Sequence, residues 1–196
     1  MMKYITILLL LPVISIYSQN IDINILKDIN LNRNKQLDGI FRGITNSAAP
    51  VAYAVPVLLL GYGLMKKDSL TKQNALYIGT TVLSSEIIST ILKYSVARPR
   101  PFVTYPFLEK VTSGGSPSFP SGHTSDAFAL ATSVSIAYPK WYVIIPSYAW
   151  AGAVGYSRMD LGVHYPSDVL AGAIIGAGSA YLCYKGQQWL HKKRKQ

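Results

Sequence analysis

Five apolar segments, almost free of charged side chains, dominate this chain of 196 residues. Charged residues make up only 14% of the whole chain, and Glu86 is the one charged residue inside the five segments. The segment lengths lie near the lower limit of about 17–25 residues that a membrane-spanning helix needs. The pattern predicts an all-α fold, a membrane helical bundle of five to six apolar helices. The segments are residues 48–65, 74–92, 127–138, 141–157 and 169–184.

The loops between the segments distinguish a membrane bundle from the buried helices of a soluble all-α protein. If successive segments alternate in direction, residues 66–72, residues 138–140 and the tail 185–196 share one side and carry most of the basic side chains outside the motifs described below. Cytoplasmic loops of membrane proteins show such an excess. We therefore expect a multi-pass protein of a bacterial inner (cell) membrane, with its C-terminal tail in the cytoplasm and its opposite face toward the periplasm or exterior.

The N-terminal part of the chain divides into two short segments. Residues 1–18 carry Lys3, an apolar stretch and a polar end, which is the pattern of a signal peptide or of an uncleaved N-terminal anchor. Residues 19–47 repeat apolar side chains at spacings of three and four, which predicts one or two amphipathic helices. We expect these helices to lie on the membrane surface or to pack across the top of the bundle, and we expect no chemistry from them.

Charge and cysteine content narrow the classes of partner. The net charge is +10, which indicates an anionic partner. No aromatic-basic motif is visible and the cations lie mostly at the ends of apolar segments, so we expect no nucleic-acid partner. The single cysteine, Cys183, excludes a disulfide within the chain and a cysteine-based metal site.

The first candidate site surrounds Arg158, His164 and Asp168. Asp168 faces the imidazole of His164 if a helix begins between them, and Pro166 suits a first helical turn. A carboxylate on one ring nitrogen fixes the tautomer and makes the other nitrogen more nucleophilic. Arg158 supplies a planar fork for phosphate oxygens. The alternative is an ordinary loop with a capping aspartate and a surface arginine.

The second candidate stretch is Pro120-Ser121-Gly122-His123, just before an apolar segment. Ser121 is a plausible N-cap, so the amides near Gly122 would open a helix and point toward an anion. His123 is a candidate general acid. The alternative is a simple turn that precedes a helix.

The third stretch runs from Lys93 to Pro101 and holds Arg98 and Arg100. Its two prolines predict that a helix ends here, so that these cations project into a loop. The alternative is a basic helix end that satisfies its own last carbonyls or binds lipid headgroups.

Together the three stretches resemble the motifs of the type 2 phosphatidic acid phosphatase superfamily, which also includes class A acid phosphatases and vanadium haloperoxidases. They appear in the family's order, and the spacing selects Arg100 over Arg98. The resemblance implies a helical phosphatase domain over residues 48–196, including the basic tail 185–196, with the active site at one end of the bundle. The matching positions are Lys93-x6-Arg100-Pro101, Pro120-Ser121-Gly122-His123 and Ser157-Arg158-x5-His164-x3-Asp168.

The resemblance also implies how a phosphate binds. Five groups surround it: the side chains of Lys93, Arg100 and Arg158, the hydroxyl of Ser121 and the amide of Gly122. The cations neutralise the charge that phosphoryl transfer spreads over the phosphate oxygens. No metal or other cofactor is expected, because the chain holds only nine acidic residues and no carboxylate cluster accompanies the motifs.

The implied chemistry uses three residues. His164 attacks phosphorus and becomes a phosphohistidine, while Asp168 orients its ring. His123 protonates the leaving oxygen and then activates the water that hydrolyses the intermediate.

The expected function is hydrolysis of a lipid phosphate or diphosphate at the membrane surface. Undecaprenyl diphosphate, phosphatidic acid, phosphatidylglycerol phosphate and lipid A phosphates all fit, and the loop 102–119 is expected to face the substrate. Two alternatives are a secreted, soluble class A-type acid phosphatase and a non-catalytic membrane protein that binds anionic lipid. Glu86 is either a functional acid or one satisfied by Ser84 and Ser85, and Asp126 is interpreted as a first-turn helix acid rather than a partner of the site.

Overall fold

The computed structural model describes residues 21–193, with side chains as far as residue 190, and every regular element in this part of the chain is a helix. This confirms the predicted all-α fold. The predicted signal peptide or anchor, residues 1–18, lies outside the described residues. Residues 21–31 are helical. They are followed by η1 (Lys35–Leu37), α2 (Asp38–Asn46), α3 (Ala48–Met65), α4 (Ser69–Val96), α5 (Pro101–Thr104), α6 (Gly122–Ala137), α7 (Trp141–Asp160) and α8 (Pro166–Lys193).

Local sequence explains where the helices that carry the predicted motifs begin and end. Asp68 caps α4 by accepting hydrogen bonds from the amides of Leu70 and Thr71. At its other end, α4 stops at Ala97, which adopts a left-handed conformation with φ of 50°. Pro101 then opens the short α5. Lys93 therefore lies in the last turn of α4, while Arg98 and Arg100 lie in the extended segment beyond it.

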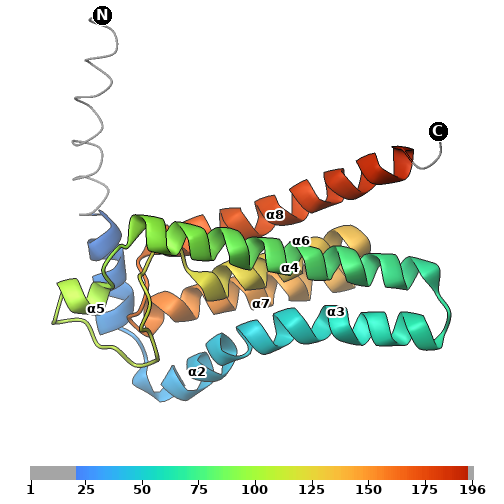
Figure 1. Cartoon of the computed structure of the whole chain (residues 1–196). Helices are drawn as coiled ribbons and strands as arrows, with labels where there is room; N and C mark the ends of the chain where they lie inside the picture. Colours follow the sequence, from blue (N-terminus) through green and yellow to red (C-terminus); the bar gives the residue numbers. More distant parts are fainter. Residues whose placement is uncertain (1–20, 194–196) are drawn as a thin grey trace, which may run out of the picture.

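The long helices lie side by side with α6 at the centre (Figure 1). Helix α6 packs against α3, α4, α7 and α8. Its approach to α8 is close because α8 presents glycines there: a Cβ on Gly172 would lie 2.6 Å from the carbonyl oxygen of Ser121, and one on Gly176 would lie 2.3 Å from that of Ser125. The small-residue pattern at these two positions permits this contact.

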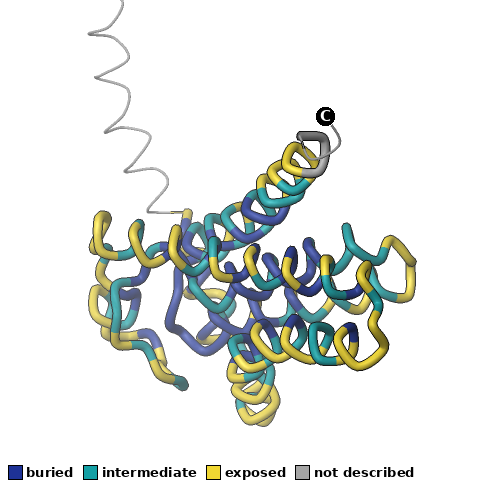
Figure 2. Tube along the Cα trace, turned by 45° about the vertical axis from the view of Figure 1, so that its right-hand side comes forward, coloured by how far each residue is buried: buried dark blue, intermediate teal, exposed yellow. Residues whose placement is uncertain are grey.

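The outside of the bundle is apolar, as expected for helices that contact lipid. Three helical stretches are long and apolar enough to cross a membrane: Lys35–Met65, Ser69–Thr104 and Pro166–Leu190. Large apolar side chains on them are exposed, including Leu58, Leu83 and Ile174. Exposed positions alternate with buried ones along the long helices (Figure 2). Helices α6 and α7 are not among the three, although the sequence suggested a span for each. Helix α6 has 16 residues and buries a face of small and hydroxyl side chains at the centre of the bundle.

The helical residues 21–31 and α2 lie at one end of the bundle, beside α5 and the start of α8 (Figure 1). Ile23 and Leu26 pack with Leu108 and Tyr165 in a cluster of buried apolar side chains. The N-terminal segment therefore packs on the same end that holds the predicted motifs.

The contact between α6 and α8 generates a prediction about stability. Gly176→Ala places a Cβ against the backbone of α6, with Ser125 O at 2.3 Å and Ala129 N at 2.7 Å, and backbone cannot move aside as a side chain can. We expect a loss of about 1–3 kcal/mol, measured as a lower thermal midpoint in detergent. Gly178→Ala is the matched control on the same helix, because nothing lies within 4 Å of its Cβ position. Equal effects of the two substitutions would contradict the packing described.

Candidate active site

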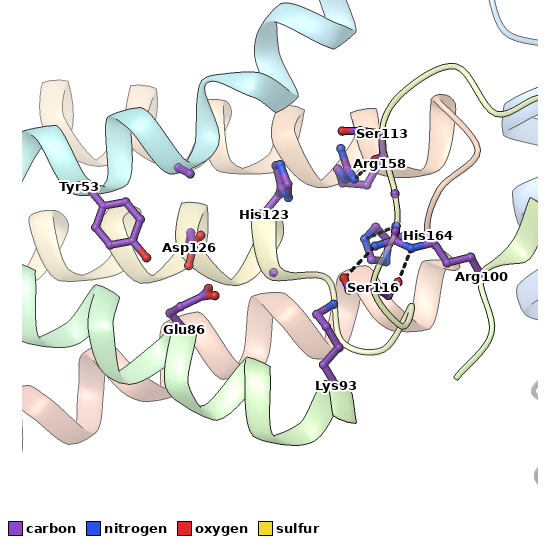
Figure 3. A pocket seen from close by; sticks show the side chains of 14 residues that line it. Tyr53, Glu86, Lys93, Arg100, Ser113, Ser116, His123, Asp126, Arg158 and His164 are labelled. Atoms are coloured by element: carbon purple, nitrogen blue, oxygen red, sulfur yellow. Dashed lines mark hydrogen bonds between the residues drawn. The ribbon is translucent and has the colours of Figure 1, made fainter. Parts of the chain in front are cut away.

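A pocket of about 450 Å³ opens at the end of the bundle where the three motifs meet (Figure 3). Six of the eight predicted site residues line it. The pocket continues past His123 between α3, α4 and α6. The six predicted residues are Lys93, Arg100, Gly122, His123, Arg158 and His164.

Two cations of the first motif are held by backbone carbonyls. The Lys93 ammonium donates to the carbonyl oxygens of Pro117 at 3.0 Å and Pro120 at 2.9 Å. The Arg100 guanidinium donates through Nε to Ser116 O at 2.8 Å and through Nη1 to Val163 O at 2.9 Å. Carbonyl groups orient the cations but leave their charge uncompensated.

Arg158 is the largest side chain that is almost fully buried, with 2% of its surface exposed. Its Nη1 donates to the Thr45 hydroxyl at 2.7 Å and its Nη2 lies 3.4 Å from Ser113 O. Its Nε has no hydrogen-bond partner among the described residues. A buried guanidinium with an unused donor is suited to bind an anion.

No carboxylate forms an ion pair with Lys93, Arg100 or Arg158 within residues 21–190. Three cations that line one pocket without such a partner attract a multiply charged anion strongly, because their repulsion is relieved only when the anion binds. A phosphate group matches the pocket in charge and in hydrogen-bonding capacity.

The ring of His164 lies between an arginine and a carboxylate. Nδ1 lies 3.4 Å from Asp168 Oδ2, and Nε2 lies 3.2 Å from Arg100 Nη1. A guanidinium can only donate, so Nε2 is the acceptor and Nδ1 carries the proton toward Asp168. Burial, together with the nearby Arg158 and Arg100, lowers the pKa of His164 to about 3. The ring is therefore neutral, and the lone pair of Nε2 accepts a hydrogen bond from Arg100 on the pocket side.

Asp168 lies behind His164 in the first turn of α8 and does not line the pocket. The helix begins at Pro166, as predicted, and brings the two side chains together. The same carboxylate also accepts hydrogen bonds from the Ser118 hydroxyl and from the amide of Tyr165. These bonds hold it in one orientation toward the imidazole.

Arg98 is the fourth cation of this region and has a different role from the other three. Its Nη1 donates to Asp168 Oδ1 at 2.7 Å, and its Nη2 donates to Asp22 Oδ2 at 2.8 Å. Asp22 also accepts from the amide and hydroxyl of Ser167. Arg98 is thus compensated by two carboxylates and supports Asp168.

The second motif forms the N-terminus of α6. Ser121 occupies the N-cap position, as predicted, but its hydroxyl is fully buried and bonds to Thr124 Oγ1 at 2.8 Å. It does not line the pocket, whereas Gly122 and His123 do. No side-chain contact fills the space above Gly122, so an anion can approach the start of the helix.

Several residues of this end gave no signal in the sequence. Asp22 and Thr45 contact Arg98 and Arg158, yet they belong to the N-terminal segment from which no chemistry was expected. The sequence did not indicate these contacts, because side chains 76 and 113 residues apart in the chain meet only in the folded bundle.

The loop between the first two motifs has two parts. Residues 113–116 line the pocket, and a Cβ on Gly114 would lie 2.8 Å from Arg100 Nη1, so glycine is needed for this approach. The aromatic part of the loop instead packs on the N-terminal helix: Leu108 is buried with Leu26, and the Phe107 ring lies 5.8 Å from Lys27 Nζ. Only the glycine-rich part of the loop faces the pocket.

The donor set of the site is one of cations and imidazoles. Among the residues that the structure describes, no group of three or more His, Cys, Asp or Glu side chains is placed to hold a metal ion.

Residues 74–192 match the family model described as the PAP2 superfamily. The chain is 30% identical to an undecaprenyl-diphosphatase of Bacillus subtilis, over 79% of this chain and 77% of that protein. It is 32% identical to an undecaprenyl-diphosphatase of Sulfolobus acidocaldarius, over 91% and 88%. Two solved structures share the fold. LpxE of Aquifex aeolicus has a TM-score of 0.73 at 25% identity over 84% of this chain and 95% of that one, and a phosphatidylglycerolphosphate phosphatase of Bacillus subtilis has a TM-score of 0.72 at 26% identity over 88% and 87%.

The uncompensated cations predict that inorganic phosphate stabilises the protein. A ligand at 100 times its dissociation constant stabilises the folded state by about 2.7 kcal/mol. We expect phosphate to raise the thermal midpoint above that in chloride of the same ionic strength, and Arg158→Ala to remove the rise. Lys66→Ala, at the turn between α3 and α4, is the control and should keep it. The same rise in Arg158→Ala would contradict a site among these cations.

The buried, neutral His164 predicts a dependence of stability on pH. Its pKa is about 3 in the folded protein, below the ordinary value of 6.5, so the unfolded chain binds a proton that the folded protein excludes. This contribution to stability is present above pH 6.5 and is lost as the pH falls from 6.5 toward 3. We expect His164→Gln to lose less thermal stability than the wild type between pH 7 and pH 4.5. Parallel curves for the two proteins would contradict the assignment.

Proposed function

The chain belongs to the PAP2 superfamily and is a phosphatase of lipid phosphates or diphosphates, and we propose that it works without a metal ion through a phosphohistidine on His164. The observation that carries the proposal is the position of the neutral His164 ring, whose unprotonated Nε2 accepts from Arg100 beside a pocket of three uncompensated cations. The remaining steps follow from the groups around that ring.

Binding comes first. The phosphate of the lipid lies among Lys93, Arg100 and Arg158, with the amide of Gly122 at the start of α6. Arg100 donates a hydrogen bond to the lone pair on Nε2 of His164. A phosphate draws that guanidinium onto its own oxygens, because a charge-assisted hydrogen bond to an anion is stronger than one to a neutral imidazole. Substrate binding thereby releases the nucleophile.

Phosphoryl transfer then uses two imidazoles, one as the nucleophile and one as the general acid. Nε2 of His164 forms a bond to phosphorus as the bond from phosphorus to the leaving oxygen breaks, and Asp168 stabilises the positive charge that develops on the ring. His123 gives its proton to the leaving oxygen. The phosphate dianion offsets the cations around His123, which favours the protonated ring that this step needs.

Hydrolysis completes the cycle. His123, now neutral, takes a proton from water as the water oxygen attacks phosphorus. The bond from phosphorus to Nε2 breaks, inorganic phosphate leaves, and Arg100 returns to His164. The proton that His123 donates to the leaving oxygen is replaced by the proton that it takes from water, so the enzyme returns to its starting state.

Orientation in the membrane follows from the charge at the two ends of the bundle. The turn between α3 and α4, with Lys66, Lys67 and Lys72, lies at the end opposite the pocket, as does the far end of α8 (Figure 1). The excess of basic residues on that side supports a cytoplasmic location for it. We propose that the protein lies in a bacterial inner membrane with the pocket facing the periplasm or exterior.

The proposal is tested with protein purified in detergent. We expect phosphate release, with EDTA present, from one or more of four lipids: phosphatidic acid, phosphatidylglycerol phosphate, undecaprenyl diphosphate and a lipid A phosphate. His164→Ala should lower the rate by at least about a thousandfold, because the nucleophile is lost. His191→Ala is the matched control on the far end of α8 and should keep the wild-type rate.

The intermediate is measured separately. Brief mixing with a lipid labelled on phosphorus should give a phosphoprotein that is labile in acid and stable in base, as a phosphohistidine is, and His164→Ala should give none. Substantial phosphatase activity in His164→Ala would exclude the proposed nucleophile. Cleavage of a water-soluble aryl phosphate without release from any lipid would exclude a lipid substrate.

A further inference from the structure

The pocket does not end at the catalytic groups. Beyond His123 it continues along α6 toward the middle of the bundle, where Glu86, Asp126 and Tyr53 line it (Figure 3). Their side chains come from α4, α6 and α3 and converge on one point, with the Tyr53 hydroxyl directed toward the two carboxyl groups. The proposed mechanism uses none of the three.

Asp126 carries an unused hydrogen-bond acceptor. The residue is 5% exposed, and its Oδ1 has no partner among the described residues. Leaving a buried polar atom unpaired costs about 1–3 kcal/mol, so such an atom indicates a missing donor. The interpretation of Asp126 as a helix-end acid does not account for this burial.

Glu86 is not satisfied in the way that its neighbours in sequence suggested. Ser85 bonds to Ser125, and Ser84 lies 3.8 Å from the sulfur of Cys183. Glu86 accepts from Thr90 at 3.3 Å and lies beside the carboxyl group of Asp126 (Figure 3). The two carboxyl groups therefore offer hydrogen-bond acceptors to the pocket.

We propose that Glu86, Asp126 and Tyr53 form a subsite that binds a hydroxyl or amine group on the alcohol part of the lipid, next to the phosphate. The inference rests on the proposed function and specifies its substrate class. The leaving oxygen lies at His123, so the carbon atoms attached to it extend along the pocket toward Asp126. A hydroxyl or amine at that position supplies the donor that Oδ1 lacks.

The same subsite disfavours a diphosphate. In a prenyl diphosphate the leaving group begins with a second phosphate, which would lie on the side of the pocket that holds the carboxyl pair. Two anionic groups in one desolvated pocket repel each other, and phosphate oxygens at neutral pH are acceptors rather than donors. The subsite thus favours a phosphomonoester of a polar alcohol, such as a glycerol or a sugar, over a diphosphate.

An apolar groove continues from this point. Residues of α3 and α4, including Tyr53, Val57 and Leu83, line a groove of about 250 Å³ on the side of the bundle. Tyr53 belongs to both the pocket and the groove. A lipid with its phosphate among the cations can place its polar alcohol at the carboxyl pair and its hydrocarbon chain in the groove.

The test compares two lipids that differ in one donor. The first is a single-chain glycerol phosphate with a free hydroxyl beside the phosphate-bearing carbon, and the second has that hydroxyl methylated. We expect the wild type to favour the first by about tenfold or more in kcat/KM, because the second leaves the Asp126 acceptor unpaired. Undecaprenyl diphosphate, measured in the same preparations, should be a poorer substrate than the first lipid.

Three variants separate the contributions. Asp126→Ala removes the acceptor and should reduce the preference to about twofold or less, and Asp126→Asn keeps an acceptor without charge and should keep the preference while improving diphosphate hydrolysis. Asp28→Asn, on the exposed face of residues 21–31, is the control and should match the wild type in every ratio. Ratios measured within one preparation do not depend on the fraction of folded protein.

Four results would overturn the proposal. They are equal rates on the two lipids by the wild type, a preference that persists in Asp126→Ala, a uniform fall on all substrates in both Asp126 variants, and a wild type that prefers the diphosphate. Failure of the proposed function is recognised differently: the wild type would then release no phosphate from any lipid, or His164→Ala would release as much as the wild type.

Discussion

Three positive charges without a carboxylate partner give the pocket at this end of the bundle its attraction for anions. Lys93, Arg100 and Arg158 are oriented by carbonyl oxygens and by the hydroxyls of Thr45 and Ser116, which fix their positions without neutralising them. Burying cations without an anion beside them lowers the stability of the folded protein. In the proposed mechanism, a bound phosphate removes this penalty, which strengthens its binding.

The position of His164, the proposed nucleophile, depends on a second charged group, the buried Asp168. This carboxylate meets His164, Ser118 and Arg98, and it lies in the first turn of α8. Arg98 in turn is held by Asp22 from the N-terminal helix. The N-terminal segment, the end of α4, the loop before α6 and the start of α8 are therefore joined by one network. A change in any of them alters the orientation of one imidazole.

The fold and most of the pocket were predictable from sequence because their signals are local. An uncharged apolar run predicted α3 with the bounds that the structure shows, and Pro166 between His164 and Asp168 predicted the helix start that brings the pair together. Asp22 and Thr45 were not predictable, because their partners are distant in the chain and nothing beside them in sequence marks them. Ser121 shows a second limit of sequence-based prediction. Its motif predicted that it lies at a helix start, but not that its hydroxyl bonds to Thr124 instead of facing the pocket.

The polarity of the pocket lining changes in a fixed order along its length. Cations line one part of it, a carboxyl pair lies beyond His123 beside Tyr53, and Tyr53 also lines an apolar groove between α3 and α4. This sequence of charge, hydrogen-bond acceptor and hydrocarbon parallels the sequence of groups in a membrane lipid from phosphate to polar alcohol to chain. A substrate that entered in reverse would bring its phosphate to the carboxyl pair and its chain to the arginines, and both contacts would be unfavourable. The order of charges therefore selects the direction in which the lipid lies and keeps its phosphorus within reach of His164.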